Sequence, residues 1–121
     1  MPFALKRAYD APLPSDGFRV LVDRLWPRGI RREELAIDEW LRDVAPSNEL
    51  RQWFHEDPDR FPVFAERYLE ELRMDGAHKA AVQHLWALEQ AHGRVTLVYA
   101  ARDPVRNHAR VLLQHLESRE P

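Results

Sequence analysis

The stretch that decides the fold reads Phe18-Arg19-Val20-Leu21-Val22-Asp23-Arg24-Leu25-Trp26-Pro27-Arg28-Gly29. Its first half, Phe18 to Val22, is rich in apolar and β-branched residues and predicts a buried strand. Its second half becomes charged, and Pro27 and Gly29 favour a rigid turn. Because ligands of open α/β sheets gather beyond the carboxyl ends of the strands, this loop is the first candidate for a site.

A second apolar run, Val95-Thr96-Leu97-Val98-Tyr99-Ala100, also predicts a strand and ends in charged residues. We expect the two strands to be parallel neighbours, so that the Cα atoms of Arg24 and Arg102 lie on the same edge of the sheet. The predicted fold class is α/β, with a small, mainly parallel sheet flanked by helices in a Rossmann-like three-layer arrangement. Residues 1–121 are expected to form one domain.

The remaining elements follow from periodicity and from breaking residues. We expect a strand over residues 3–9, a loop over 10–17, and helices over 31–35, 38–44, 48–54, 61–72, 77–92 and 104–117. The loop is short for a parallel crossover, so the first strand is either antiparallel to the second or not its neighbour. Ser47 is the expected cap of the helix over 48–54, and Asp103 that of the last helix, with Pro104 as its first residue.

Composition excludes several classes of function. The chain has no cysteine, which removes disulfides, thiol nucleophiles and thiolate metal sites. The net charge is −2, whereas generic nucleic-acid binding needs a basic excess, so nucleic acid is not an expected partner. No signal peptide or membrane span is recognisable, and a cytoplasmic protein without membrane contact is expected. Composition defines neither a cofactor nor an oligomeric state.

The candidate site combines residues from both strand ends and from the start of the last helix. The catalytic candidates are Asp23 and His108, since a carboxylate and an imidazole can move protons near neutral pH. Ligand-binding candidates are Arg24, Trp26, Arg28, Tyr99, Arg102 and Asn107. Their arginines suit phosphate or carboxylate, and the N-terminus of the last helix favours an anion.

Each candidate also has a structural interpretation, which the sequence leaves open. Asp23 can pair with an arginine and only brace the loops. His108 can lie on a half-buried helix face and bond a backbone carbonyl. Trp26 can shield the loop arginines instead of covering a ligand. The run His55-Glu56-Asp57 contains metal-binding side chains, but consecutive helical residues point in different directions, and we predict no metal site.

Several short segments form a recognisable pattern. They are Lys6-Arg7-Ala8-Tyr9-Asp10, residues 15–29 (ending Val-Asp-Arg-Leu-Trp-Pro-Arg-Gly), Ala45-Pro46-Ser47, Glu49-Leu50-Arg51, Trp53-Phe54-His55, Arg67-Tyr68, Glu71-Leu72, residues 96–101 and Asn107-His108-Ala109. With this pattern the chain resembles the YeaO-like branch of a bacterial family of uncharacterised proteins, domain of unknown function 488.

The resemblance implies a small α/β domain and brings no settled activity with it. Related branches often carry Cys-His-Arg where this chain has Asn107-His108-Ala109, which implies that His108 lies near the strand-end loops. The thiol chemistry of such branches does not transfer, because the cysteine is absent. Many relatives read Gly-His-Asp-Pro after Trp-Phe, whereas here the histidine, His55, comes one place earlier.

Two functions are consistent with these observations. The first is an enzyme or sensor for a small anionic ligand, such as a nucleotide or a phosphorylated metabolite, held by the arginines. The alternative is a non-catalytic protein-interaction or regulatory module that uses Trp26 and Arg28. Ligand binding would stabilise the protein by mass action, whereas an interaction module would retain a protein partner through Trp26.

Replacing Asp23 tests whether its carboxylate is buried and paired. Its carboxylate follows four apolar residues, and a buried carboxylate requires a partner. We expect Arg28, Arg102 or backbone amides of the loop to bond it. Asp23→Ala should then lower the free energy of unfolding by roughly 3–5 kcal/mol, measured by urea unfolding. Asp23→Asn should cost less if amides are the donors. A loss below about 1 kcal/mol would indicate an exposed residue.

Overall fold

The computed structural model describes residues 2–118. Its centre is a four-stranded sheet in the order β1-β4-β2-β3, in which every pairing is parallel. The strands are β1 (Phe3–Arg7), β2 (Phe18–Leu21), β3 (Glu39–Trp40) and β4 (Val95–Tyr99). The two strands predicted most clearly, β2 and β4, are parallel neighbours, and β4 separates β1 from β2.

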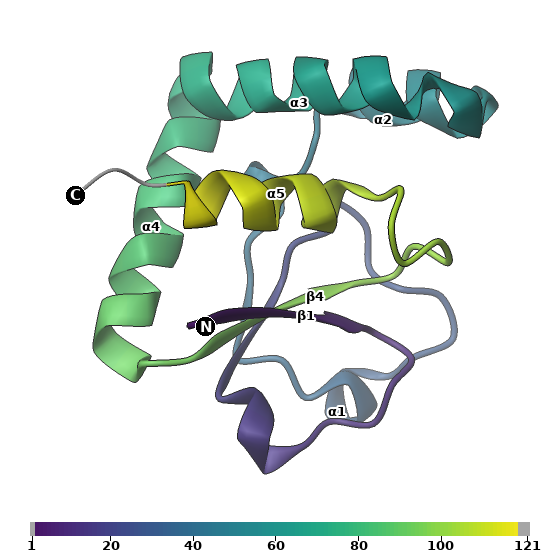
Figure 1. Cartoon of the computed structure of the whole chain (residues 1–121). Helices are drawn as coiled ribbons and strands as arrows, with labels where there is room; N and C mark the ends of the chain where they lie inside the picture. The colour runs from purple at the N-terminus through teal and green to yellow at the C-terminus, as the bar shows by residue number, and fades with distance from the viewer. Residues whose placement is uncertain (1, 119–121) are drawn as a thin grey trace.

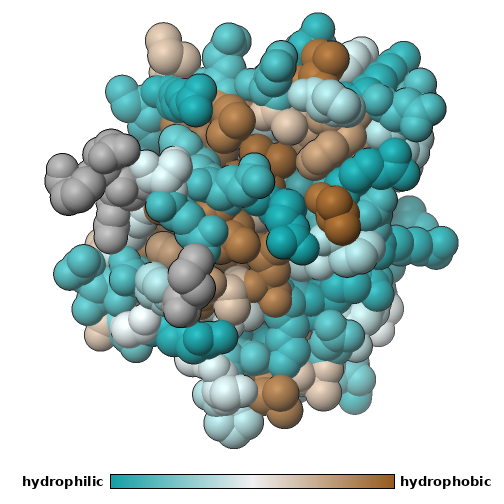
Figure 2. Space-filling model, in the orientation of Figure 1, coloured by the Kyte–Doolittle hydropathy of each residue, from teal (hydrophilic) through white to brown (hydrophobic). Residues whose placement is uncertain are grey.

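Helices cover both faces of the sheet, which confirms the predicted α/β class (Figure 1). They are α1 (Arg32–Leu35), α2 (Asn48–Glu56), α3 (Phe61–Met74), α4 (Gly76–His92) and α5 (His108–Glu117). In Figure 1, α5 lies above the strands, α2 and α3 lie farther out on that side, and α1 lies on the opposite side. Figure 2 shows a mainly hydrophilic surface with apolar patches in the region of α3 and α5.

Alternation along the two central strands explains this layering. Val20 and Val22 face one cluster of buried side chains together with Leu97 of β4. Leu21 and Val98 face the other way and pack with Leu35 of α1. Because successive side chains of a strand point to opposite faces, a run that is apolar at every position needs a cover on both sides.

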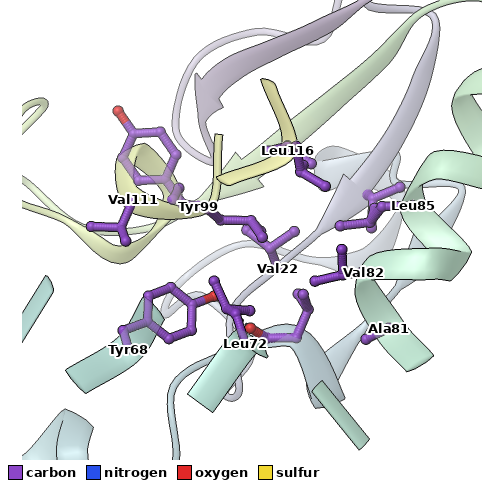
Figure 3. Packing of buried hydrophobic residues seen from close by; sticks show 14 of the residues in the cluster. Val22, Tyr68, Leu72, Ala81, Val82, Leu85, Tyr99, Val111 and Leu116 are labelled. Carbon is purple, nitrogen blue, oxygen red and sulfur yellow. Dashed lines mark hydrogen bonds between the residues drawn. The ribbon is translucent and has the colours of Figure 1, made fainter. Parts of the chain in front are cut away.

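The larger cluster lies between the sheet and the helices α3, α4 and α5 (Figure 3). The labelled members are Val22, Tyr68, Leu72, Ala81, Val82, Leu85, Tyr99, Val111 and Leu116. Tyr68 is fully buried, and its hydroxyl donates a hydrogen bond to the Val44 carbonyl. This bond satisfies the one polar atom that the tyrosine brings into the core.

The predicted helix over residues 38–44 is wrong. Glu39–Trp40 forms the edge strand β3, and a single 3₁₀ turn, Arg42–Val44, follows it. The amide of Asp38 donates to the Arg19 carbonyl (2.8 Å) and that of Leu41 to the Leu21 carbonyl (2.9 Å). Both bonds pair the segment with β2, and the second takes an amide that a helix would use locally, so sheet pairing overrides helical propensity.

The last helix begins four residues later than predicted, at His108. Asp103 does cap a turn, accepting from the amides of Val105 (2.9 Å) and Arg106 (3.0 Å). The helix itself is capped by Asn107, whose side chain accepts from the Arg110 amide (2.9 Å). Two Asx caps compete in this segment, and the second begins the helix. By contrast, the predicted cap at Ser47 is confirmed, since its hydroxyl accepts from the Leu50 amide.

A buried charge cluster holds the loop before β2. Asp16 accepts from Arg19 Nη1 (2.6 Å), Lys6 Nζ (3.1 Å) and the Leu13 amide (3.0 Å). Arg19 also donates to the carbonyls at the end of α1. Burial by itself raises the pKa of Asp16, but these hydrogen bonds outweigh it and lower the pKa below the ordinary value. The cluster therefore joins β1, β2 and α1.

Asp16→Ala should lower the free energy of unfolding by about 3–5 kcal/mol, because it leaves the buried Arg19 without its carboxylate. Asp59→Ala is the control, since that side chain is 92% exposed, and it should change stability by about 0.5 kcal/mol or less. Both are measured by urea unfolding at neutral pH. Because the pKa of Asp16 is lower in the folded protein than in the unfolded chain, the ionised carboxylate stabilises the fold at pH values above the unfolded pKa. The loss caused by Asp16→Ala should therefore shrink as the pH falls below about 4. Equal losses for the two variants would contradict this account.

Candidate functional site

A pocket of about 460 Å³ lies beyond the carboxyl ends of β2 and β4. It is bounded by the loops after these strands and by residues of α2, α3 and α5. Seven predicted site residues line it, namely Asp23, Arg24, Trp26, Arg28, Arg102, Asn107 and His108. Arg24 and Arg102 thus lie at the same edge of the sheet, as expected. We call this cavity the strand-end pocket.

The eighth predicted residue, Tyr99, is not among the residues that line this pocket. It belongs to β4, is 4% exposed and packs into the core. Burial raises the pKa of its hydroxyl, so the phenol stays protonated. Tyr99 is the last residue of β4, and the lining of the pocket from this strand end starts with the next residue, Ala100.

Asp23 joins the ends of the two central strands. Its Oδ2 atom accepts from the Ala100 amide at 3.0 Å, and its Oδ1 atom lies 3.0 Å from His108 Nε2. Its hydrogen-bond partner is therefore the amide of the residue that follows β4, whereas the buried Oδ1 faces the imidazole without a hydrogen-bond partner among the described residues. The expected arginine partners are wrong. His108 Nε2 also faces the Val22 carbonyl at 3.1 Å. Since both neighbours are acceptors, Nε2 carries a proton.

Arg24 is committed to the backbone. Its Nε donates to the Pro46 carbonyl (3.1 Å) and its Nη2 to the Ala45 carbonyl (3.0 Å). The Ala45 carbonyl also faces His78 Nε2 at 2.8 Å. The guanidinium thus ties the loop after β2 to the segment before α2, and two of its five N–H donors are committed to the backbone.

Trp26 is likewise part of the fold. Its indole N–H donates to the Ile30 carbonyl at 2.7 Å, and its ring meets Trp40 edge to face at a centroid distance of 5.4 Å. The side chain is half-buried and packs against the cluster around Leu35. Of the two interpretations of Trp26, this geometry favours a role in closing the loop.

Arg28 and Arg102 differ from Arg24, because both are exposed and neither has a carboxylate within ion-pairing distance among residues 2–118. They follow β2 and β4 respectively and line the same pocket. Unpaired guanidinium groups at a concave site are suited to carboxylate or phosphate.

Two further lining residues, Arg51 and His55, were not among the predicted binding residues. They lie four residues apart on α2, so both project from one side of that helix. Arg51 Nε is buried and has no hydrogen-bond partner within the described chain. The i, i+4 spacing is visible in the sequence, but the packing of α2 against the strand ends is not.

The pocket is electropositive although the chain is acidic. Its lining includes four arginines, Arg24, Arg28, Arg51 and Arg102, and one carboxylate, Asp23. No serine, threonine, cysteine or lysine side chain is among the described residues that line it. The arrangement can hold an anion, and it contains none of the common alcohol, thiol or amine nucleophiles.

The side chains of the run His55-Glu56-Asp57 do not meet at a common point that could hold a metal ion. Glu56 pairs with Arg60 at 3.0 Å, and Asp57 caps the following turn by accepting from the Asp59 amide. Within residues 2–118 no three histidine or acidic side chains are grouped as metal ligands. None of the described helices is long and apolar enough to cross a bilayer.

Fold and pocket together define a parallel α/β protein with a cationic strand-end cavity. The chain belongs to the family of domain of unknown function 488, since the model described as the inactive DUF488-N3 subclade matches residues 2–120. It is 49% identical over 115 residues to uncharacterised proteins of Mycobacterium tuberculosis and Mycobacterium bovis, covering 93% of this chain and 92% of theirs. It is 42% identical over 118 residues to the uncharacterised protein YeaO of Escherichia coli, covering 98% and 99%. No solved structure matches the chain.

The contacts of the arginines predict different effects on stability. Arg24→Ala removes two charged hydrogen bonds to backbone carbonyls and should lower the free energy of unfolding by about 1.5–3 kcal/mol. Arg28→Ala and Arg102→Ala, the matched controls, remove exposed side chains and should each change it by about 0.5 kcal/mol or less. Urea unfolding measures all three. Comparable losses at Arg24 and Arg28 would refute the division into structural and free arginines.

Proposed function

We propose that this protein binds a small anionic ligand in the strand-end pocket and does not transform it. The observation that carries the proposal is the charge of the pocket, which has four arginines and a single carboxylate. Like charges that gather in one concave site repel one another unless an opposite charge compensates them. A bound phosphate or carboxylate would compensate the charges of Arg28 and Arg102.

In this proposal the two arginines after the strands hold the anion from opposite loops. Arg51 and His55 approach from α2 and add further donors. A nucleotide or a phosphorylated metabolite fits the charge, and a cavity of about 460 Å³ is within the usual range for small-molecule sites.

The contacts of Asp23 and His108, the two residues that the sequence suggested as catalytic, favour binding without turnover. Asp23 is engaged by the Ala100 amide and by His108. Each of these contacts joins parts of the fold, so we assign both side chains to holding the strand ends together. The family description, an inactive subclade, agrees with this assignment.

A protein-interaction module is the second candidate, and one observation favours it. Leu25 and Tyr9, both at the pocket, are 60% and 48% exposed. Apolar residues of this size at the rim of a cationic cavity suit the contact surface of a partner. Trp26 gives this candidate less support, because its indole is already bonded and packed.

A thermal-shift series with inorganic phosphate, adenosine monophosphate and adenosine triphosphate tests the binding function. A ligand at about 100 times its Kd should stabilise the protein by about 2.7 kcal/mol. Arg28→Ala and Arg102→Ala should each abolish most of that shift, whereas Arg73→Ala, an exposed arginine of α3 outside the pocket, should preserve it.

The proposal is wrong if no anion stabilises the protein, or if the shift is the same in all three variants. Capture of a stoichiometric protein partner that depends on Leu25 and Tyr9, without any small-molecule response, would favour the interaction module.

A further inference from the structure

The two edges of the sheet differ in length. The edge strand β3 has two residues, whereas the opposite edge strand, β1, has five, as many as the central strand β4. Native proteins commonly shorten an edge strand, interrupt it with proline or a bulge, or place charged side chains along it, because an open edge pairs with other strands. The β3 edge is blunted by its length, and the β1 edge is not.

The backbone of β1 presents unpaired groups on its open side. The Ala8 amide donates to the Tyr99 carbonyl of β4, whereas the Arg7 carbonyl turns outward and accepts from the Asp10 amide. Because backbone groups alternate between the two sides of a strand, the amide and carbonyl of Leu5, two residues before Arg7, also face outward. Outside the sheet ladder, these two groups have no hydrogen-bond partner within residues 2–118.

The charged side chains of β1 do not guard this edge. Lys6 Nζ bonds both carboxylate oxygens of Asp16 (3.1 and 3.2 Å), and Arg7 Nε donates to the Ala101 carbonyl (3.0 Å). The strand contains no proline, and its register with β4 is continuous, so it has no bulge. In Figure 1, β1 crosses in front of β4, and no other described segment is drawn over it.

An open cavity of about 480 Å³ follows the same edge and is lined by four consecutive residues of β1, Ala4 to Arg7. Two of its other lining residues carry opposite charges at opposite ends of the strand. Arg94 lies at the amino end, since the next residue, Val95, pairs with Phe3, and Asp10 lies beyond the carboxyl end. A second copy that docks in the antiparallel direction therefore brings Asp10 of each copy towards Arg94 of the other.

We propose that β1 pairs antiparallel with β1 of a second copy of this chain, about a two-fold axis at Leu5, and joins the two four-stranded sheets into one. Only this register overlaps all five residues of both strands. A two-fold contact uses the same surface on each copy, and the short β3 edge offers no second site of this kind, so assembly ends at the dimer. The inference is independent of anion binding.

Sedimentation velocity of the full chain over a range of concentrations measures the pairing, and it should show a monomer–dimer equilibrium. Leu5→Pro should raise the dissociation constant at least about tenfold, because it removes an outward amide without taking a bond from β4. Urea unfolding checks that this variant folds. An unchanged protein that stays monomeric at about 1 mM would overturn the inference, because any dimer with a smaller dissociation constant would then be populated.

A charge reversal at an exposed position tests the antiparallel direction without touching the core. Asp10→Arg should raise the dissociation constant several-fold, because it places a cation opposite Arg94 of the second copy. Asp59→Arg is the matched control, since Asp59 is exposed and lies outside the cavity along β1, and it should leave the equilibrium unchanged. Equal effects of the two reversals would contradict the proposed direction.

The position of the axis can be tested by cross-linking. The chain has no cysteine, so a single Leu5→Cys substitution can form a disulfide only with the same residue of a second copy. Directly opposite residues of a hydrogen-bonded antiparallel pair have Cα atoms about 5.5 Å apart, which a disulfide spans. Mild oxidation should therefore give a cross-linked dimer in non-reducing electrophoresis. Leu13→Cys is the control, since Leu13 is 53% exposed and lies outside β1. Equal cross-linking of the two variants, or none of Leu5→Cys, would overturn the proposed interface.

Discussion

The parallel register of β2 and β4 is the constraint on which the pocket depends. Leu21 pairs with Val98, and the Val22 amide donates to the Val98 carbonyl. Beyond this point the ladder continues through a side chain, as Asp23 accepts from the Ala100 amide at 3.0 Å. The carboxylate thus extends the pairing past the end of both strands. A shift of one residue would turn every side chain of β2 to the opposite face.

Residues 44–46, which lead from the 3₁₀ turn to α2, are fixed by hydrogen bonds to side chains far away along the chain. The carbonyls of Val44, Ala45 and Pro46 are bound by Tyr68, His78 and Arg24. A segment with its own repetitive hydrogen bonds would not need these partners. This arrangement carries α2 to the strand ends and brings Arg51 and His55 to the pocket. It also separates Arg24, which is structural, from the arginines that remain free.

Charge is distributed unevenly by the same fold. The chain carries a net charge of −2, yet the pocket is lined by four arginines and one carboxylate. Acidic side chains elsewhere are used locally, as in the pairs of Asp16 with Arg19 and of Glu56 with Arg60. Overall composition argues against a generic polyanion binder, but it carries no information on where the unpaired charges gather.

The sequence alone determined the two central strands, the charged loop after each, the capped helix at Ser47 and the location of most pocket residues at one sheet edge. Those features depend on local periodicity and on turn chemistry, which are written in neighbouring residues. Only the tertiary structure decided that residues 39–40 form a strand, that α5 is capped by Asn107 instead of Asp103, and that Asp23 accepts from the Ala100 amide. These outcomes depend on partners far away along the chain, and several local options of similar free energy are separated only by those contacts.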